Sequence, residues 1–293
     1  MEKIGSAIKF TFSGHDSFQC RQLWLKKGFD FIQEKQAFYN EDAVVKLGVG
    51  KNMVSAIRYW MKAFNIIDSK DKPTAFGIKL FDNENGYDPF LEDEASLWLL
   101  HYQLIKTGLA SMYSIIFNEF RKEKLFFNKD TFLNYLKRRR DAEPSLIFND
   151  NTVADDFIVF VKMYQSSGAS KDVEDSFSGI LSEIELLKTI GKGKEEQYQI
   201  ENNDRDKLPH AVLLFSILDN HNYGNSISLN SLEFDHNSPG SIFALNRSGL
   251  TNKISEIVSE NKNIIFTDHA GIKELQFKNK LNAYSILDTY YGS

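Results

Sequence analysis

Apolar side chains recur along the first part of the chain with helical spacing. Between positions 15 and 32 they return every three or four residues, with an interruption at Gly28, which predicts a helix with a break at that glycine. Asn40 and Asp42 can cap a second, short helix, and Gly48 stands where that helix should end. The chain is therefore expected to turn near Gly48.

A longer helix is predicted after this turn, with Asn52 as its cap and Ile67 as its end. At about 100° per residue its side chains separate into two faces. The face predicted to be buried is apolar and carries Val54, Ile57, Trp60, Met61 and Phe64. The opposite face carries cations and hydrogen-bonding groups, namely Lys51, Asn52, Ser55, Arg58, Tyr59 and Lys62. One face can thus pack while the other, with Arg58 and Lys62 exposed, meets a partner.

A polar turn at 68–73 precedes an alternating segment at 74–81, where Phe76, Ile78 and Leu80 predict a strand. Helix, short helix, glycine turn, longer helix and hairpin in this order are typical of a winged helix-turn-helix. In that module the helix after the turn enters the major groove of DNA. We expect such a domain over residues 1–86.

The remaining chain is mainly helical in its spacing. We expect helices at 91–105, 111–123, 129–140, 152–164 and 173–190, the last leading into a hairpin around Tyr198. From Leu208 the pattern predicts a helix, a short segment at 229–234, a helix through Ile254, and a hairpin of 263–268 with 272–277. The predicted fold class is mainly α (α+β). A helical domain at 87–204 ends in a winged-like passage, and a further winged-helix-like unit follows at 205–293.

Composition and charge exclude some classes of function. The length of 293 residues exceeds one winged-helix unit, and 42% hydrophobic with 26% charged residues are globular proportions. A net charge of −5 argues against a protein that coats nucleic acid everywhere. Residues 1–72, however, hold 12 Lys and Arg against 8 Asp and Glu, which is +4 and leaves −9 for the rest. The positive charge therefore gathers where the helix-turn-helix is predicted.

The single cysteine indicates the compartment. Cys20 cannot form an intrachain disulfide, which suits a reducing environment, and it is expected to be a buried small residue rather than a nucleophile. No run approaches about 18 apolar residues, and the first ten residues lack the apolar core of a signal peptide. We expect a cytoplasmic protein without membrane contact.

Motifs for catalysis, nucleotides and metals are weak. The glycines and lysine of 47–52 lack the spacing of a phosphate-binding loop. His15 and Asp16 are neighbours along the chain, so we expect them to cap the first helix rather than to form a triad with Ser17. The basic run 137–140 is expected at a solvated helix end rather than on phosphate. No catalytic residue, metal site or cofactor is predicted.

Several motifs in the first 65 residues carry a family resemblance. They are Gly14-His15, Ser17-Phe18, Arg21, Trp24-Leu25, Lys27-Gly28, the segment 47–54 (Leu-Gly-Val-Gly-Lys-Asn-Met-Val), Ile57, Tyr59-Trp60 and Ala63. This pattern resembles the bacterial family called domain of unknown function 4007. The resemblance implies a setting in phage-defence or DNA sulfur-modification clusters, beside a phosphoadenosine-phosphosulfate-reductase-like protein and a cysteine desulfurase. It implies no catalytic residues.

Three functions follow as hypotheses. The first is a non-enzymatic subunit or regulator that binds double-stranded DNA through the polar face that begins at Lys51. The second is an adaptor that uses its winged modules for protein contacts inside a modification complex. The third is an enzyme whose site forms only in the fold.

Overall fold

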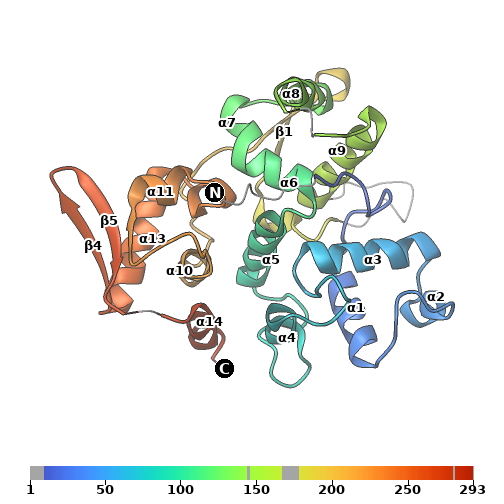
Figure 1. The fold of residues 1–293 in the computed structure, drawn as a ribbon, viewed down its shortest axis with the longest axis horizontal. Helices are drawn as coiled ribbons and strands as arrows, with labels where there is room; N and C mark the ends of the chain where they lie inside the picture. The colour runs from blue at the N-terminus through green and yellow to red at the C-terminus, as the bar shows by residue number, and fades with distance from the viewer. Residues whose placement is uncertain (1–9, 144–145, 167–177, 280, 293) are drawn as a thin grey trace, which may run out of the picture.

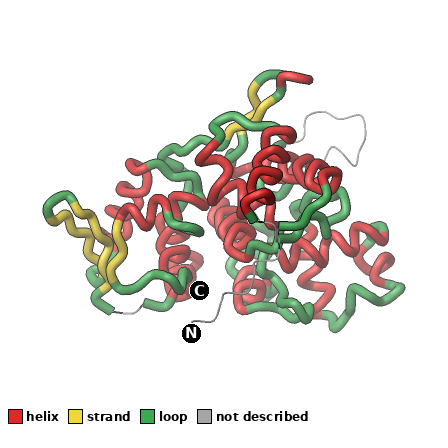
Figure 2. Tube along the Cα trace, turned by 45° about the horizontal axis from the view of Figure 1, so that its top comes forward, coloured by secondary structure: helices red, strands yellow, loops and turns green. Residues whose placement is uncertain are grey.

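Helices dominate the computed structural model, and strands are confined to two small antiparallel sheets (Figures 1 and 2). The structure describes residues 10–143, 146–166, 178–279 and 281–292. This composition agrees with the predicted mainly α, α+β class. No helix in the described ranges is long and apolar enough to cross a membrane.

The N-terminal part consists of α1 (Trp24–Gln33), α2 (Ala43–Leu47), α3 (Lys51–Ala63) and α4 (Ala75–Phe81). Gly48 ends α2 with a left-handed φ of +63°, as predicted. Gly28 does not break α1, because it is the point where α3 approaches; a Cβ there would lie 2.2 Å from the Met61 sulfur. Residues 15–23 are not an α-helix, and the cap of α3 is Gly50 rather than Asn52. The predictions of a break at Gly28, of a helix from residue 15 and of Asn52 as a cap were therefore wrong, and α3 ends at Ala63 rather than at the predicted Ile67.

The predicted strand at 74–81 is the helix α4, which corrects the wing. The Thr74 hydroxyl caps this helix by accepting from the Gly77 N–H at 2.9 Å. Phe76 and Leu80 are buried one helical turn apart, whereas Ile78 is 45% exposed. Phe76 and Leu80 fit both periods, and the capping threonine favours the helix. Only a single bridge between Ile67 and Pro73 remains of the expected hairpin.

The middle is helical. It contains α5 (Glu94–Thr107), α6 (Ser111–Ile115), the π-helical η1 (Ile116–Phe120), α7 (Arg121–Glu123), α8 (Lys129–Ala142) and α9 (Asp150–Tyr164), so the helices predicted between 91 and 164 are confirmed. The α5 helix is the central element, since 95–105 are all buried. In Figure 1 it lies between the N-terminal helices and the C-terminal unit.

The helix predicted at 173–190 is wrong over its described part, while residues 173–177 lie outside the described residues. Residues 178–190 form a turn, η3 (Ser182–Ile184) and β1 (Lys188–Ile190). The segment docks on other elements instead: a Cβ on Gly179 would lie 2.2 Å from the Lys162 carbonyl oxygen, and the Ile180 N–H donates to the Cys20 carbonyl at 3.0 Å. The hairpin is confirmed, because β1 pairs with β2 (Gln197–Gln199) across the short η4 (Gly193–Glu195).

The C-terminal part alternates helices and strands. Its elements are α10 (His210–Leu218), β3 (Ser226–Ser228), α11 (Leu229–Phe234), α12 (Pro239–Ile242), α13 (Arg247–Glu260), β4 (Ile264–His269), β5 (Ile272–Phe277) and α14 (Ala283–Tyr291). The sheet order is β3-β5-β4, all antiparallel, with Leu275 opposite both Ile227 and Phe266. The predicted hairpin is confirmed.

One continuous hydrophobic core joins these parts, from Cys20 to Leu287. Within it, both nitrogens of the buried His101 are occupied, Nδ1 with the Tyr164 hydroxyl at 2.9 Å and Nε2 with the Ile242 carbonyl at 2.8 Å. Burial lowers the pKa of His101 to about 3, so the ring stays neutral. It links α5, α9 and the C-terminal part. The domain boundaries proposed at 86 and 204 stay predictions.

Candidate nucleic-acid interface

The α3 helix has the two faces that its sequence predicts. Val54 and Met61 are buried on one side together with Ile57, Trp60 and Phe64. Lys51, Asn52, Ser55 and Arg58 are exposed on the other side and form a stripe along the helix, which we call the α3 stripe. The amphipathic division is therefore confirmed, and the use of this stripe in binding stays a prediction.

Two residues predicted for the site are less accessible. Tyr59 lies under the N-terminal segment, where a Cβ on Gly14 would approach its ring Cε2 to 2.6 Å. Burial, together with the charge of Asp156, raises the pKa of Tyr59 well above its ordinary value. Lys62 is half-buried at the far end of the stripe. The structure brings Lys51, Asn52, Ser55 and Arg58 together in the open, while Tyr59 serves as a support.

The carboxylate of Asp71 pairs with two cations of α3, Arg58 and Lys62. Both oxygens of Asp71 accept from the Arg58 Nε at 3.0 Å, and Asp71 Oδ1 lies 2.8 Å from the Lys62 Nζ. Partial burial would raise the pKa of Asp71, but hydrogen bonds and charge from Arg58 and Lys62 outweigh it and lower the pKa. The cluster carries a net charge of +1. No local pattern in the sequence indicates this cluster, because Asp71 is one of several polar residues in a turn.

A groove of about 790 Å³ runs along α3 beside the stripe. Its polar rim includes Lys51, Ser55 and Arg58, and its apolar wall comes from Val44 and Val54. At its edge Tyr39 is 84% exposed. Glu41 also lines the groove, so its charged lining comprises three cations, Lys51, Arg58 and Lys62, and one carboxylate.

His15 and Asp156 fix the segment that borders this groove. His15 Nε2 lies 3.0 Å from Asp156 Oδ1, which also accepts from the Ser13 N–H at 2.8 Å. The His15 ring is 1% exposed and stacks on Trp60 at 5.1 Å. The prediction that His15 and Asp16 cap the first helix was wrong, because α1 begins at Trp24 and has no side-chain cap. Asp156 is 143 positions from Ser13, so local sequence patterns cannot reveal this contact.

The densest basic run of the sequence is engaged in contacts within the fold. Lys137 pairs with Asp150 at 2.8 Å, Arg138 with Glu123 at 3.1 Å, and Arg139 with Glu119. Arg140 lies 4.9 Å over the ring of Phe148. The run therefore lies at the end of α8, as expected, but it contacts neighbouring side chains rather than only solvent.

Comparison with known proteins places the chain in a family. A family model described as protein of unknown function (DUF4007) matches residues 12–291. The chain belongs to this family. The match spans the α3 stripe, the helical middle and the C-terminal sheet, so the resemblance seen in the first 65 residues extends over nearly the whole chain. A comparison with curated proteins finds no match.

Two solved structures have a similar fold. One, described as "Magnesium ion-bound SspB crystal structure", has a TM-score of 0.84 and 25% identity over 96% of this chain and 88% of that chain. The other, "SspB crystal structure", has a TM-score of 0.83 and 24% identity over the same shares. Magnesium is a property of that first protein. Within the described residues of this chain, His, Cys, Asp and Glu form no group of three or more that could hold a metal ion.

The C-terminal part presents a second exposed helix stripe. On α13, Asn252, Ser255, Glu256 and Glu260 are exposed. Both glutamates lie against His210, at 3.3 Å and 2.8 Å. This stripe is polar and acidic, so it is a poor surface for phosphate.

Proposed function

We propose that this protein is a DNA-binding component of a bacterial DNA-modification or phage-defence system. The observation that carries the proposal is the α3 stripe, a row of exposed cationic and hydrogen-bonding side chains on the helix after the glycine turn. Lys51 and Arg58 would contact phosphates, and Asn52 and Ser55 would contact base edges.

The arrangement of elements supports a winged-helix assignment for the C-terminal unit. The order α10, β3, α11, α12, α13, β4, β5, with β5 in the centre of the sheet, is that of a winged helix. In the N-terminal unit α1, α2 and α3 have the order of a helix-turn-helix, and the Ile67–Pro73 bridge takes the place of a wing. We assign the DNA contact to the N-terminal unit on the ground of charge.

The wider setting rests on similarity. The SspB structures share the fold at 24–25% identity, and the DUF4007 resemblance implies neighbours in DNA sulfur modification. We propose as partners the phosphoadenosine-phosphosulfate-reductase-like protein and the cysteine desulfurase that the resemblance implies. The cytoplasmic location and the absence of catalysis stay predictions.

Fluorescence anisotropy with a labelled duplex across a salt series tests the proposal. Arg58→Ala with Lys62→Ala should weaken binding and reduce the slope of log affinity against log salt. The reduction should be about 1.8, because the variant removes two cations and each phosphate contact contributes about 0.9 to the slope. Lys262→Ala with Lys278→Ala removes the same charge from two exposed lysines of the C-terminal unit and should leave the slope unchanged.

Equal affinity and slope for the wild type and the Arg58/Lys62 variant would refute the assignment to α3. A wild type that binds no duplex at low salt would refute DNA binding altogether. The same samples run on a denaturing gel show whether either strand is cut, and cleavage would refute the predicted non-enzymatic role. Parallel assays with phosphorothioate in the duplex test whether the modification is recognised.

An adaptor role is the second candidate. Tyr39, just before α2, and Val45, within it, are 84% and 80% exposed, and together they offer apolar surface for a protein contact. If no duplex binds, co-purification with the two proposed partner proteins becomes the deciding experiment. Loss of the complex in Tyr39→Ser with Val45→Ser would support the adaptor.

A further inference from the structure

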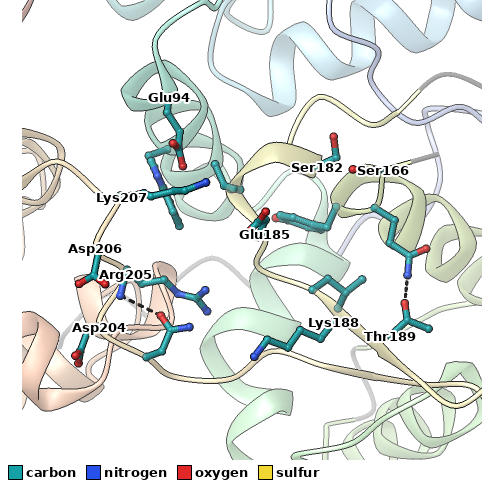
Figure 3. Close-up of a pocket in the computed structure, with 16 residues that line it drawn as sticks. Glu94, Ser166, Ser182, Glu185, Lys188, Thr189, Asp204, Arg205, Asp206 and Lys207 are labelled. Carbon is teal, nitrogen blue, oxygen red and sulfur yellow. Dashed lines mark hydrogen bonds between the residues drawn. The ribbon is translucent and has the colours of Figure 1, made fainter. Parts of the chain in front are cut away.

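Two large pockets in the described part of the protein differ in the charge of their lining. One, a cavity of about 970 Å³, lies where the helical middle meets the C-terminal unit (Figure 3). Four carboxylates and three cations line it, and they are interspersed, since Asp204 and Asp206 stand on either side of Arg205 in the chain. Its lining has a net charge of −1, so it is a poor site for the phosphate of DNA.

The other pocket is the groove of about 790 Å³ along α3, which we call the α3 groove. Its volume is within the range of sites that enclose a small ligand. All three cations of its lining come from α3, whereas its one carboxylate, Glu41, belongs to the segment 38–44 that leads into α2. The lining therefore has a net charge of +2, or of +1 when Asp71, which pairs with two of these cations, is counted.

Several polar side chains of the α3 groove are exposed and free to bind. In the part of the chain that the structure describes, the side chains of Tyr39, Glu41, Lys51 and Ser55 form no hydrogen bond or ion pair. The basic run 137–140 is different, because its side chains are engaged by neighbouring residues. A ligand in the α3 groove can thus contact these groups without breaking contacts of the fold.

An exposed aromatic ring lies at the edge of the α3 groove. Tyr39 is 84% exposed, and the apolar lining includes Val44 and Leu109, both partly buried. An exposed aromatic ring can hold the flat face of a nucleotide base by stacking. In a duplex the faces of each base are covered by the neighbouring base pairs. Only a base that has left the stack can therefore contact Tyr39 in this way.

We propose that the α3 groove holds one unpaired nucleotide of the bound DNA, an inference that rests on the DNA-binding function proposed above. The phosphate lies on the α3 side, where Lys51 and Arg58 are exposed, and the base lies against Tyr39 and Val44. The Glu41 carboxylate repels a phosphate but can accept a hydrogen bond from an amino group of a base. The distribution of charge therefore sets which end of the nucleotide faces α3.

Fluorescence anisotropy with two labelled DNAs of equal length tests this proposal. One is a fully paired duplex, and the other has a single unpaired nucleotide opposite an abasic position in its centre. Extruding a paired base costs free energy, and this cost is smallest for a base that has no partner. The wild type should therefore bind the DNA with the unpaired nucleotide about 10-fold more tightly than the paired duplex.

Three variants test whether Tyr39 provides the contact. Tyr39→Ala should reduce the preference for the unpaired nucleotide to about 2-fold or less, because the stacking surface is lost. Tyr39→Phe keeps the ring and should keep the preference. Phe234→Ala is the matched control, because it removes an aromatic side chain that is 56% exposed on α11 and does not line the α3 groove. It should bind both DNAs as the wild type does.

The outcomes separate this site from DNA binding in general. A wild type that binds both DNAs equally, or a Tyr39→Ala variant that keeps the full preference, would overturn the nucleotide site and leave the DNA-binding function in place. A wild type that binds neither DNA would overturn both. If Tyr39→Ala keeps the preference but loses the complex with the proposed partner proteins, the ring serves the protein contact of an adaptor, and the nucleotide site is refuted.

Discussion

The two ends of the molecule use a similar order of helices for different surfaces. At one end α1 is followed by the short α2 and then by the longer amphipathic α3, and at the other end α10 is followed by β3, by the short α11 and α12, and then by the longer amphipathic α13. Both bury apolar side chains on one face, with Ile57 and Ile254 each fully enclosed. Their exposed stripes differ: the α3 stripe presents Lys51 and Arg58, and α13 presents Glu256 and Glu260. The packing of the two helices is therefore similar, whereas the charge of their exposed faces is opposite.

The elements after these helices also differ. The α13 helix leads into two paired six-residue strands, whereas α3 is followed by the connection 64–74 and then by the helix α4. The turn places Asp71 against Arg58, and the hairpin has no counterpart to this contact among its described residues. The N-terminal unit thus has the helix α4 where a wing was predicted. It also has an acidic clamp, by which we mean Asp71 paired with Arg58 and Lys62.

The largest effect on the free energy of unfolding is expected for substitutions of buried side chains at the two ends, which compare how well each end is packed. Trp60→Ala should lower the free energy of unfolding by about 3–5 kcal/mol, because Trp60 is fully buried and its Nε1 donates to the Phe18 carbonyl at 2.9 Å. Ile254→Ala should cost about 2–5 kcal/mol. Urea denaturation measures both. An unchanged midpoint for Trp60→Ala would contradict the described packing of the N-terminal unit.

A pH dependence follows from His101, which joins the middle to the C-terminal part. Its folded pKa is about 3 because of burial, and in the unfolded chain a histidine titrates near 6.5. Between these values only the unfolded chain takes up the proton, so the free energy of unfolding should fall by about 1.4 kcal/mol per pH unit as the pH drops below about 6.5.

Denaturation of the wild type and His101→Gln at several pH values from 7.5 to 5 measures this difference. The variant should be less stable at pH 7.5 and should depend less steeply on pH. His221→Gln, at an exposed position, serves as the control. Parallel pH profiles for His101→Gln and the wild type would show that the ring is not buried as described.

The acidic clamp predicts a gain of function. Asp71→Asn should release Arg58 and Lys62 and raise affinity for duplex DNA by about 3- to 10-fold at low salt, with a smaller gain at high salt. Asp268→Asn on the β4–β5 hairpin is the matched control and should change affinity little. Weaker DNA binding by Asp71→Asn would mean that the clamp orients the cations rather than neutralising them.

The smallest effect is expected at the C-terminal unit. Glu256→Gln with Glu260→Gln removes its negative stripe, yet DNA affinity should change by less than about 2-fold if the duplex contacts only α3. Anisotropy under the conditions used for the Asp71 variant provides the measurement. A gain as large as that of Asp71→Asn would place DNA near both ends of the molecule and end the contrast between them.

The sequence by itself determined most helices and the division of α3 into two faces. The helices predicted between 91 and 164, the C-terminal hairpin, and the burial of Val54, Ile57, Met61 and Phe64 depend on side-chain periodicity, which local spacing records. The stop at Gly48 could be predicted because a left-handed residue after a helix favours glycine. The six candidate residues could likewise be placed on one side of a helix.

Only the tertiary structure decided which of those six are accessible and what holds them. Gly14 covers Tyr59 and Asp71 clamps Arg58, and Asp156 anchors the covering segment from 143 positions away. The secondary structure of 74–81 and of 178–190 also depends on tertiary contacts. Short apolar segments fit either a helix or a strand until neighbouring elements cover one face. The cavity of about 970 Å³ that both Glu94 and Arg205 line likewise forms only when distant segments pack. Periodicity is a local property of the chain, whereas burial, ion pairing and cavities depend on contacts between segments far apart in sequence.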